Sequence, residues 1–249
     1  MRVRSKRDAR SAFTRTELFV LLATVALAGM VGACWLIASI REKRASQCAS
    51  NLKEIALGFN LWMQDLEVSA LPWGIRGYPD IANQPAELRQ NSWLQFGYLS
   101  NQLKSPIILA DPSDKRAGLR RASNWSWSPA GGFFHSNYQN NACSYALNLD
   151  VLNWNRKLQP EPIVYKPMVL DRHFSDSRKR GDCAYDFHQV PSYPPATQVQ
   201  WTNAVHGPQF GNIGFMDGSV LRVPSSALSN AITGISDFWD DSAHYLLPR

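Results

Sequence analysis

The chain has 249 residues, of which 45% are hydrophobic and 11% aromatic, so it can bury a sizeable core and is not a disordered chain. Its formal net charge is +6, but residues 1–12 alone carry a net charge of +4. The basic character therefore belongs mostly to the N-terminal segment, and we expect no nucleic-acid partner.

A membrane-spanning helix is predicted directly after this basic leader (1–12). The segment Leu18–Ile40 runs for 23 residues without a charged side chain, and a helix needs about 20 residues to cross a hydrocarbon core. The basic leader favours a cytoplasmic N-terminus, whereas Arg41, Lys43 and Arg44 at the other end oppose that orientation. The charges alone therefore leave the orientation open.

Glu17 lies at the edge of this apolar segment, at the fifth position counted from Phe13. A carboxylate at a membrane boundary costs about 2–3 kcal/mol and usually has a partner. If the chain is cut between Ala12 and Phe13, the new α-amino group is a cation that can meet Glu17 of a neighbouring copy. The alternative is an interfacial glutamate whose side chain simply reaches water.

The order of these features resembles the type IV prepilin signal: a basic leader, a small residue, Phe, Thr, two further residues, Glu and a long apolar run. The resemblance covers residues 1–40 and implies that a prepilin peptidase cuts between Ala12 and Phe13 and methylates the new amine. It also implies that Glu17 serves subunit assembly. Two positions depart from the pattern, because Ala12 replaces the usual Gly and Arg15 replaces an apolar residue.

Two other kinds of N-terminal segment fit less well. An ordinary signal peptide has an apolar stretch of about 7–15 residues before its cleavage site, whereas this stretch is longer and ends at the charged residues 41–44. The residues VGAC, which end at Cys34, resemble a lipoprotein cleavage box, but the chain continues apolar after the cysteine. We therefore interpret Cys34 as a thiol buried in the membrane.

The helix is expected to continue beyond the membrane as a stalk. The first proline is Pro72, and the apolar residues of the intervening segment recur at alternating spacings of four and three: Cys48, Leu52, Ile55, Phe59 and Trp62. A helix from Phe13 to about Asp65 would be about 80 Å long. We expect residues 13–40 to lie in the membrane and the apolar stripe of residues 41–66 to be covered by the chain's own head.

The head, residues 67–249, is predicted to be a small α+β domain. Its apolar residues lose helical periodicity, and prolines, glycines and asparagines separate short apolar runs. We predict one helix, near Ala86–Phe96, and five strands, near Ser105–Ala110, Cys143–Leu149, Ile163–Asp171, Gly211–Met216 and Ser219–Val223.

Asp217-Gly218 separates the last two predicted strands and is typical of a two-residue hairpin turn in which both residues have positive φ. The run from His206 to Gly218 resembles the C-terminal signature of a subgroup of bacterial prepilin-like proteins, which is a His, nine residues and Asp-Gly. Here ten residues separate His206 from Asp217, so the extra residue predicts a bulge or a longer loop.

Three further segments resemble the same subgroup: Cys48–Asp65, Asp111–Arg116 and Cys143–Asn148. The second usually begins with Cys-Pro in those proteins, where this chain has Asp111-Pro112. Cys48 is therefore left without an obvious disulfide partner.

The four cysteines and five histidines form no metal-binding motif. If the head lies outside the cytoplasm, Cys143 with Cys183 is the disulfide to test first. One acid- and histidine-rich stretch is interpreted as a solvated loop rather than as a metal or hydrolytic site: Asp171, His173, Asp176, Asp182, Asp186 and His188. We predict no catalytic residue, no metal and no cofactor.

The resemblance implies a pilin-like fold and a non-enzymatic pseudopilin subunit of a type II secretion or type IV pilus-like assembly. Its partners would be prepilin peptidase, other pilin-like subunits and the lipid bilayer. The chain would be single-pass in the inner (cytoplasmic) membrane, with its N-terminus cytoplasmic and its head periplasmic or extracellular.

Two alternatives stay open. One is a membrane-anchored binding module, including a lipoprotein, for glycan or envelope material, because Trp125 and Trp127 lie among serines and asparagines. The other is an anchored hydrolase that uses His173 or His206.

Overall fold

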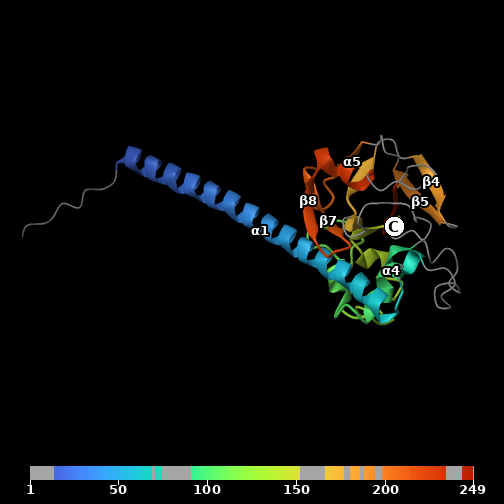
Figure 1. Ribbon diagram of the computed structural model, residues 1–249. Helices are drawn as coiled ribbons and strands as arrows, with labels where there is room; N and C mark the ends of the chain where they lie inside the picture. The colour runs from blue at the N-terminus through green and yellow to red at the C-terminus, as the bar shows by residue number, and fades with distance from the viewer. Residues whose placement is uncertain are drawn as a thin grey trace, which may run out of the picture. The chain divides into compact units, whose positions relative to one another are not determined.

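The computed structural model of the chain describes residues 14–68, 71–74, 91–151, 166–176, 180–185, 188–193, 198–233 and 243–248 (Figure 1). The basic leader, Ala12 and Phe13 lie outside the described residues, as does the start of the predicted helix Ala86–Phe96. The chain divides into two units, Met1–Lys43 and Arg44–Arg249. One unbroken helix, α1 (Arg15–Asp65), contributes residues to both units.

The N-terminal part of α1 leaves its large apolar side chains exposed. Phe19 is 71% exposed and Trp35 is 72% exposed, and the same holds along the predicted apolar segment from Leu18 to Ile40. Among the described residues, α1 is the one helix that is long enough and apolar enough to cross a membrane. The predicted apolar helix is confirmed, and it is compatible with a membrane span or a signal anchor.

The C-terminal part of α1 is amphipathic and belongs to the second unit. The whole predicted stripe is buried: Cys48, Leu52, Ile55, Phe59 and Trp62. Lys53 and Glu54, which lie between these positions, are exposed. The spacing of the apolar residues therefore correctly predicted the buried face of the helix.

The helix ends in a Schellman-type motif. Val68 N–H donates to the Met63 carbonyl over 3.0 Å, and Glu67 N–H donates to the Gln64 carbonyl over 3.1 Å. Glu67 has a φ of +54°, which places it at the left-handed position that such a motif requires. These bonds satisfy carbonyl groups that the end of the helix leaves without a helical partner.

The second unit is built on an antiparallel sheet. Seven described strands form it in the order β4-β5-β9-β1-β2-β7-β8. Their bounds are β1 Tyr145–Asn148, β2 Pro167–Asp171, β4 Arg180–Tyr185, β5 His188–Tyr193, β7 Phe210–Phe215, β8 Val220–Pro224 and β9 Ala243–Leu246. A separate two-stranded sheet pairs β3 (Phe174–Asp176) with β6 (Val199–Trp201). An α+β fold is therefore confirmed.

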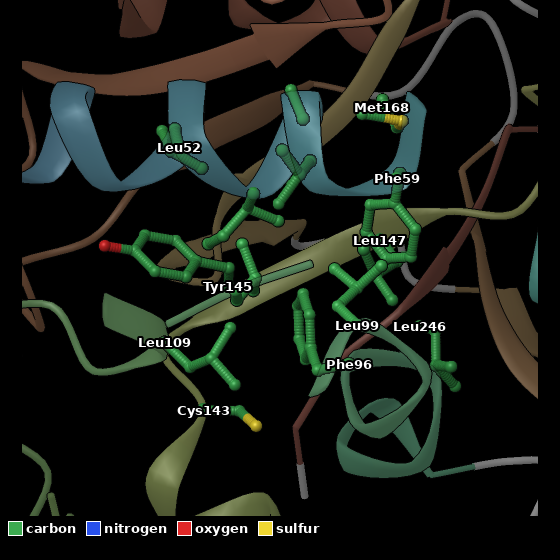
Figure 2. Packing of buried hydrophobic residues seen from close by; sticks show 14 of the residues in the cluster. Leu52, Phe59, Phe96, Leu99, Leu109, Cys143, Tyr145, Leu147, Met168 and Leu246 are labelled. Atoms are coloured by element: carbon green, nitrogen blue, oxygen red, sulfur yellow. The ribbon is translucent and has the colours of Figure 1, made fainter. Parts of the chain in front are cut away.

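Two hydrophobic cores cover the two faces of the central strands. On one face, Leu52 and Phe59 of α1 pack with Tyr145 and Leu147 of β1 (Figure 2). The intervening residue, Ala146, belongs to the other core, which also contains α5 (Ser225–Thr233), labelled beside β8 in Figure 1. Because both faces are covered, all four residues of β1 are buried.

Short helices complete the second unit: η1 Pro72–Gly74, α4 Ser92–Gly97, η2 Tyr98–Ser100, η3 Pro106–Leu109 and η4 Gln139–Ala142. The predicted strand Ser105–Ala110 is wrong, because this segment forms η3. The Ser105 hydroxyl accepts a hydrogen bond from Ile107 N–H, and Pro106 supplies the fixed φ that favours the first helical position.

The other predicted strands in the described residues are present as β1, β2, β7 and β8. The turn between β7 and β8 differs from the prediction, because only Gly218 has a positive φ, of +80°. Phe215 N–H donates to the Ser219 carbonyl over 2.9 Å, so the loop has three residues and Gly218 takes the left-handed position at its end.

Cys143 has a buried, free thiol, 3.5 Å from the Gln139 carbonyl oxygen. The structure therefore gives no support to a disulfide with Cys183, whose side chain lies outside the described part of the chain. Cys34 and Cys48 are also free.

The packing of α1 can be tested with two matched truncations. Leu52→Ala should lower the free energy of unfolding by about 2–5 kcal/mol, because it leaves a cavity at a fully buried site. Leu61→Ala removes the same atoms from a side chain that is 47% exposed, so its effect should stay within about 0.5 kcal/mol. Denaturant unfolding of the detergent-solubilised chain measures both, and equal losses would contradict the described packing.

Candidate functional site

A group of buried polar side chains lies where α1 meets the sheet. We call Cys48, Asp111, Asp171 and His206 the polar cluster; one ligand-type atom from each lies within 4.8 Å of the others. Cys48 belongs to α1, Asp111 follows η3, Asp171 ends β2, and His206 lies between β6 and β7. Four distant segments of the chain therefore converge on one point.

Asp171 is the best-connected member of the polar cluster. Its Oδ1 accepts a hydrogen bond from the Cys48 thiol over 3.1 Å, and its Oδ2 accepts one from the backbone N–H of Asn212 over 2.7 Å. The Asn212 side-chain amide reaches Cys48 Sγ over 3.3 Å. Since Asn212 belongs to β7, these bonds connect α1 to two adjacent strands of the sheet.

His206 contacts both carboxylates. Its Nε2 lies 3.0 Å from Asp111 Oδ2 and 3.5 Å from Asp171 Oδ2. The side chain of His206 is only 3% exposed, and Cys48, Asp111 and Asp171 have no exposed surface. The polar cluster is therefore closed to bulk solvent. This burial favours a structural role for the cluster over a reaction with a dissolved substrate.

Burial and mutual charge determine how the polar cluster titrates. Burial and the charge of Asp111 raise the pKa of Asp171 to about 7, despite the opposing effects of His206 and of the Asn212 N–H. Burial lowers the pKa of His206, but the close approach of Asp111 and the charges of the two aspartates outweigh this effect, and the net pKa is raised. Burial and the same two charges raise the pKa of the Cys48 thiol.

Polar and aromatic side chains surround the cluster. The Tyr145 hydroxyl accepts a hydrogen bond from the Asn51 amide over 3.3 Å and lies 3.9 Å from Cys48 Sγ. His173 stacks on Trp201 at a centroid distance of 4.8 Å and meets the His206 ring edge to face. Burial, together with the charge of His206, lowers the pKa of His173 to about 4, so this ring is neutral near pH 7.

An ion pair fixes the segment that carries Asp111. Arg172 donates two hydrogen bonds to Asp114, from Nη2 to Oδ1 over 2.7 Å and from Nε to Oδ2 over 2.9 Å. The Ser144 hydroxyl also donates to Asp114 Oδ2 over 2.7 Å. Because Arg172 follows Asp171 in sequence, this pair holds the two aspartates of the polar cluster near each other.

The residues predicted as a signature separate into two places. His206 enters the polar cluster, whereas Asp217 is exposed and its Oδ1 accepts a hydrogen bond from Ser219 N–H over 2.8 Å. Asp217 and Gly218 therefore form the hairpin turn and have no part in the cluster.

Glu17 has a local role that we did not predict from the sequence. Its Oε2 accepts a hydrogen bond from Thr14 N–H over 2.8 Å, and the Thr14 hydroxyl accepts one from Glu17 N–H over 3.3 Å. This reciprocal pair is a capping box, and its signal, Thr followed three residues later by Glu, is present in the sequence.

The interpretation of residues 171–188 as a solvated loop is wrong at its beginning, because Asp171 and His173 are buried. The side chains of Asp176, Asp182, Asp186 and His188 lie outside the described residues. The convergence of Cys48 with Asp111 was not predicted from the sequence either. The one available signal was the replacement of a cysteine by Asp111 in a segment that resembles the prepilin-like subgroup.

Comparison with protein-family models, with curated proteins and with solved structures found no match for this chain. Its function therefore has to be inferred from its residues and their geometry.

The Asp114–Arg172 pair should make stability depend on acid pH. Burial raises the pKa of Asp114, but the hydrogen bonds from Arg172, Arg116 N–H and Ser144 outweigh this effect, and the net pKa lies below its ordinary 3.8. The ionised form thus stabilises the fold at any pH above the ordinary value, and this contribution is lost as pH falls through the lowered pKa.

Asp114→Asn should therefore lower the free energy of unfolding by about 2 kcal/mol at pH 7. The difference from the unmodified chain should shrink as the pH falls below 3.8. Denaturant unfolding at several pH values measures it, with the exposed Glu54→Gln as the control. A difference that stays constant with pH would contradict the role of the charge.

Proposed function

We propose that this chain is a prepilin-like structural subunit of the pseudopilin kind, with a pilin-like fold and no enzymatic activity. The observation that carries the proposal is the division of α1 into two parts. Its apolar N-terminal part exposes large hydrophobic side chains, while the buried stripe from Cys48 to Trp62 is part of the core of the second unit. A helix divided in this way suits a subunit that is anchored in lipid and carries a folded head.

The surroundings of Glu17 support an assembly role in addition to the local one. In the capping box Glu17 Oε2 accepts a hydrogen bond from an uncharged amide, so its negative charge is not balanced by Thr14. An α-amino group at Phe13 of a neighbouring copy would supply the missing cation. The proposed partners are therefore prepilin peptidase, other pilin-like subunits and the bilayer.

The proposed location is the inner membrane, with the N-terminus in the cytoplasm and the head in the periplasm or outside the cell. The basic leader supports this orientation. The subunit would serve a type II secretion system or a type IV pilus-like assembly.

A second candidate function, a membrane-anchored module that binds glycan or envelope material, is favoured by one observation. Trp127 is 69% exposed, and its ring lies 5.4 Å from that of Phe134. An exposed aromatic ring backed by a second ring can stack against a sugar. Trp125, by contrast, is partly buried and donates a hydrogen bond to the Leu103 carbonyl over 3.0 Å, so it has a structural role.

Processing is the first test of the proposed subunit. When the chain is co-expressed with a prepilin peptidase, its membrane-extracted form should begin at a methylated Phe13, as measured by intact mass and N-terminal sequencing. Ala12→Gly restores the residue usual in prepilin signals and should increase the cut fraction. A mature form that begins at Met1 would contradict the proposal, and one that begins at Cys34 would indicate a lipoprotein.

Assembly is the second test. Glu17→Gln keeps the capping box, since glutamine also serves at this position, but it removes the charge. Cross-linking between copies in the membrane should fall about tenfold or more, which corresponds to about 1.4 kcal/mol, because the amine would be left without a counter-charge at the membrane boundary. Glu54→Gln, on an exposed part of α1, is the matched control and should leave cross-linking unchanged.

Full cross-linking of Glu17→Gln would contradict the proposed assembly. If that variant also binds a cell-wall glycan as strongly as the unmodified chain, and Trp127→Ala does not bind it, the second candidate function is favoured instead.

A further inference from the structure

We propose that the polar cluster is a structural zinc site, with Cys48 Sγ, His206 Nε2 and one carboxylate oxygen each from Asp111 and Asp171 as its four ligands. This inference does not depend on the proposed assembly function. It concerns only side chains of the second unit.

The distances between the ligand atoms fit a four-coordinate ion. Zinc binds sulfur at about 2.3 Å and nitrogen or oxygen at about 2.0–2.2 Å, so neighbouring ligand atoms of a tetrahedral site lie roughly 3.3–3.8 Å apart. In the polar cluster, His206 Nε2 lies 3.0 Å from Asp111 Oδ2 and 3.5 Å from Asp171 Oδ2, and Cys48 Sγ lies 3.1 Å from Asp171 Oδ1. One ligand atom from each of the four residues lies within 4.8 Å of the others, so side-chain shifts of up to about 1 Å would bring the four atoms into a tetrahedral arrangement.

One of the proposed ligand atoms, Asp111 Oδ2, is buried in the cluster and accepts no hydrogen bond. Asp111 has no exposed surface, and its Oδ2 makes no hydrogen bond of acceptable geometry, although it lies 3.0 Å from His206 Nε2. The other oxygen, Oδ1, accepts the backbone N–H of Ser113 over 2.5 Å. A buried carboxylate oxygen that has no donor normally has an ion or water as its partner.

Neighbouring groups orient the ligands in the way that metal sites require. Ser113 N–H fixes the carboxylate of Asp111, and Asn212 N–H fixes that of Asp171. The Asn212 side-chain amide also donates to Cys48 Sγ, a bond that stabilises a thiolate. Such outer contacts hold the ligands of a zinc site in place.

The charge of the polar cluster also favours a cation. Two carboxylates are fully buried there, and His206, the basic side chain that contacts both of them, can carry at most one positive charge. Buried charges are strongly unfavourable unless they are paired. A divalent ion would compensate both aspartates, while His206 binds it as a neutral ring and the Cys48 thiol releases its proton to solvent.

The set of ligands selects the metal. Calcium and magnesium prefer sites made only of oxygen atoms, whereas thiolate and imidazole favour zinc. Four protein ligands without solvent access are typical of structural zinc sites, because a catalytic site leaves a position open. The ion would then join α1 to the sheet and would not act on a substrate.

Metal content and cobalt spectroscopy of the full chain test the proposal. The detergent-solubilised chain, purified from cells supplied with zinc and dialysed into metal-free buffer, should retain about one zinc ion per chain. After zinc is removed, added Co²⁺ should give the visible bands of a four-coordinate ion and a near-ultraviolet band from thiolate-to-cobalt charge transfer.

Two matched pairs of variants test two of the four ligands, Cys48 and His206. Cys48→Ser should abolish the charge-transfer band and weaken zinc binding about tenfold or more, whereas Cys143→Ser, at another buried free cysteine, should change neither. His206→Gln should weaken binding similarly, whereas His244→Gln should not. His244 is a fair control because it is buried and its Nδ1 lies 3.2 Å from the Asp150 carboxylate.

Measurements on the folded, unmodified chain test the zinc site even if a variant does not fold. Less than about 0.1 zinc ion per chain, together with no thiolate band on adding Co²⁺, would overturn the proposal. Cobalt bound without that band, or bound equally well by Cys48→Ser, would show that Cys48 is not a ligand and would also overturn it.

Discussion

The packing of the C-terminal part of α1 against the sheet is the interaction on which the second unit depends. Leu52, Ile55 and Phe59 are fully buried, and they fill one of the two hydrophobic cores. The approach of helix and sheet is close, since a Cβ added at Gly214 of β7 would lie 3.5 Å from the Leu52 carbonyl oxygen. The sheet would otherwise expose this face to water, so the helix that carries the apolar N-terminal segment is also a structural part of the head.

Within that interface the polar cluster supplies directional contacts, which hydrophobic packing lacks. Apolar contacts tolerate sliding and rotation of a helix, whereas hydrogen bonds of about 3 Å do not. Cys48 lies one turn before Leu52 on the same face of α1, and it meets Asp171 of β2 and Asn212 of β7. The cluster therefore fixes both the rotation of α1 and its position along the sheet. Buried polar groups have this ordering role in some other proteins as well.

The sequence predicted features that depend on local patterns, but it did not predict contacts between distant segments. The helix and its buried face follow from apolar spacing, and the β7–β8 hairpin follows from Asp217-Gly218 between two apolar runs. The predicted strand at 105–110 failed because a serine cap and Pro106 favoured a 3-10 turn over apolar content. The polar cluster could not be predicted from local sequence patterns, since Cys48 lies 123 residues from Asp171 and 164 residues from Asn212 in sequence. Only the topology of the sheet brings these side chains together.

The structure also explains why His206 and Asp217, which lie close in sequence, serve different parts of the second unit. The β7–β8 ladder pairs residues without interruption from Phe210↔Pro224 to Gly214↔Val220, so the strand itself contains no bulge there. Gly207, directly after His206, has a φ of +99°, a conformation that residues with a side chain rarely adopt. The residues between His206 and β7 therefore form a loop, and β7 itself pairs regularly with β8. This loop lets His206 reach the polar cluster while β7 independently positions the hairpin turn. The histidine and the hairpin turn therefore have separate structural tasks.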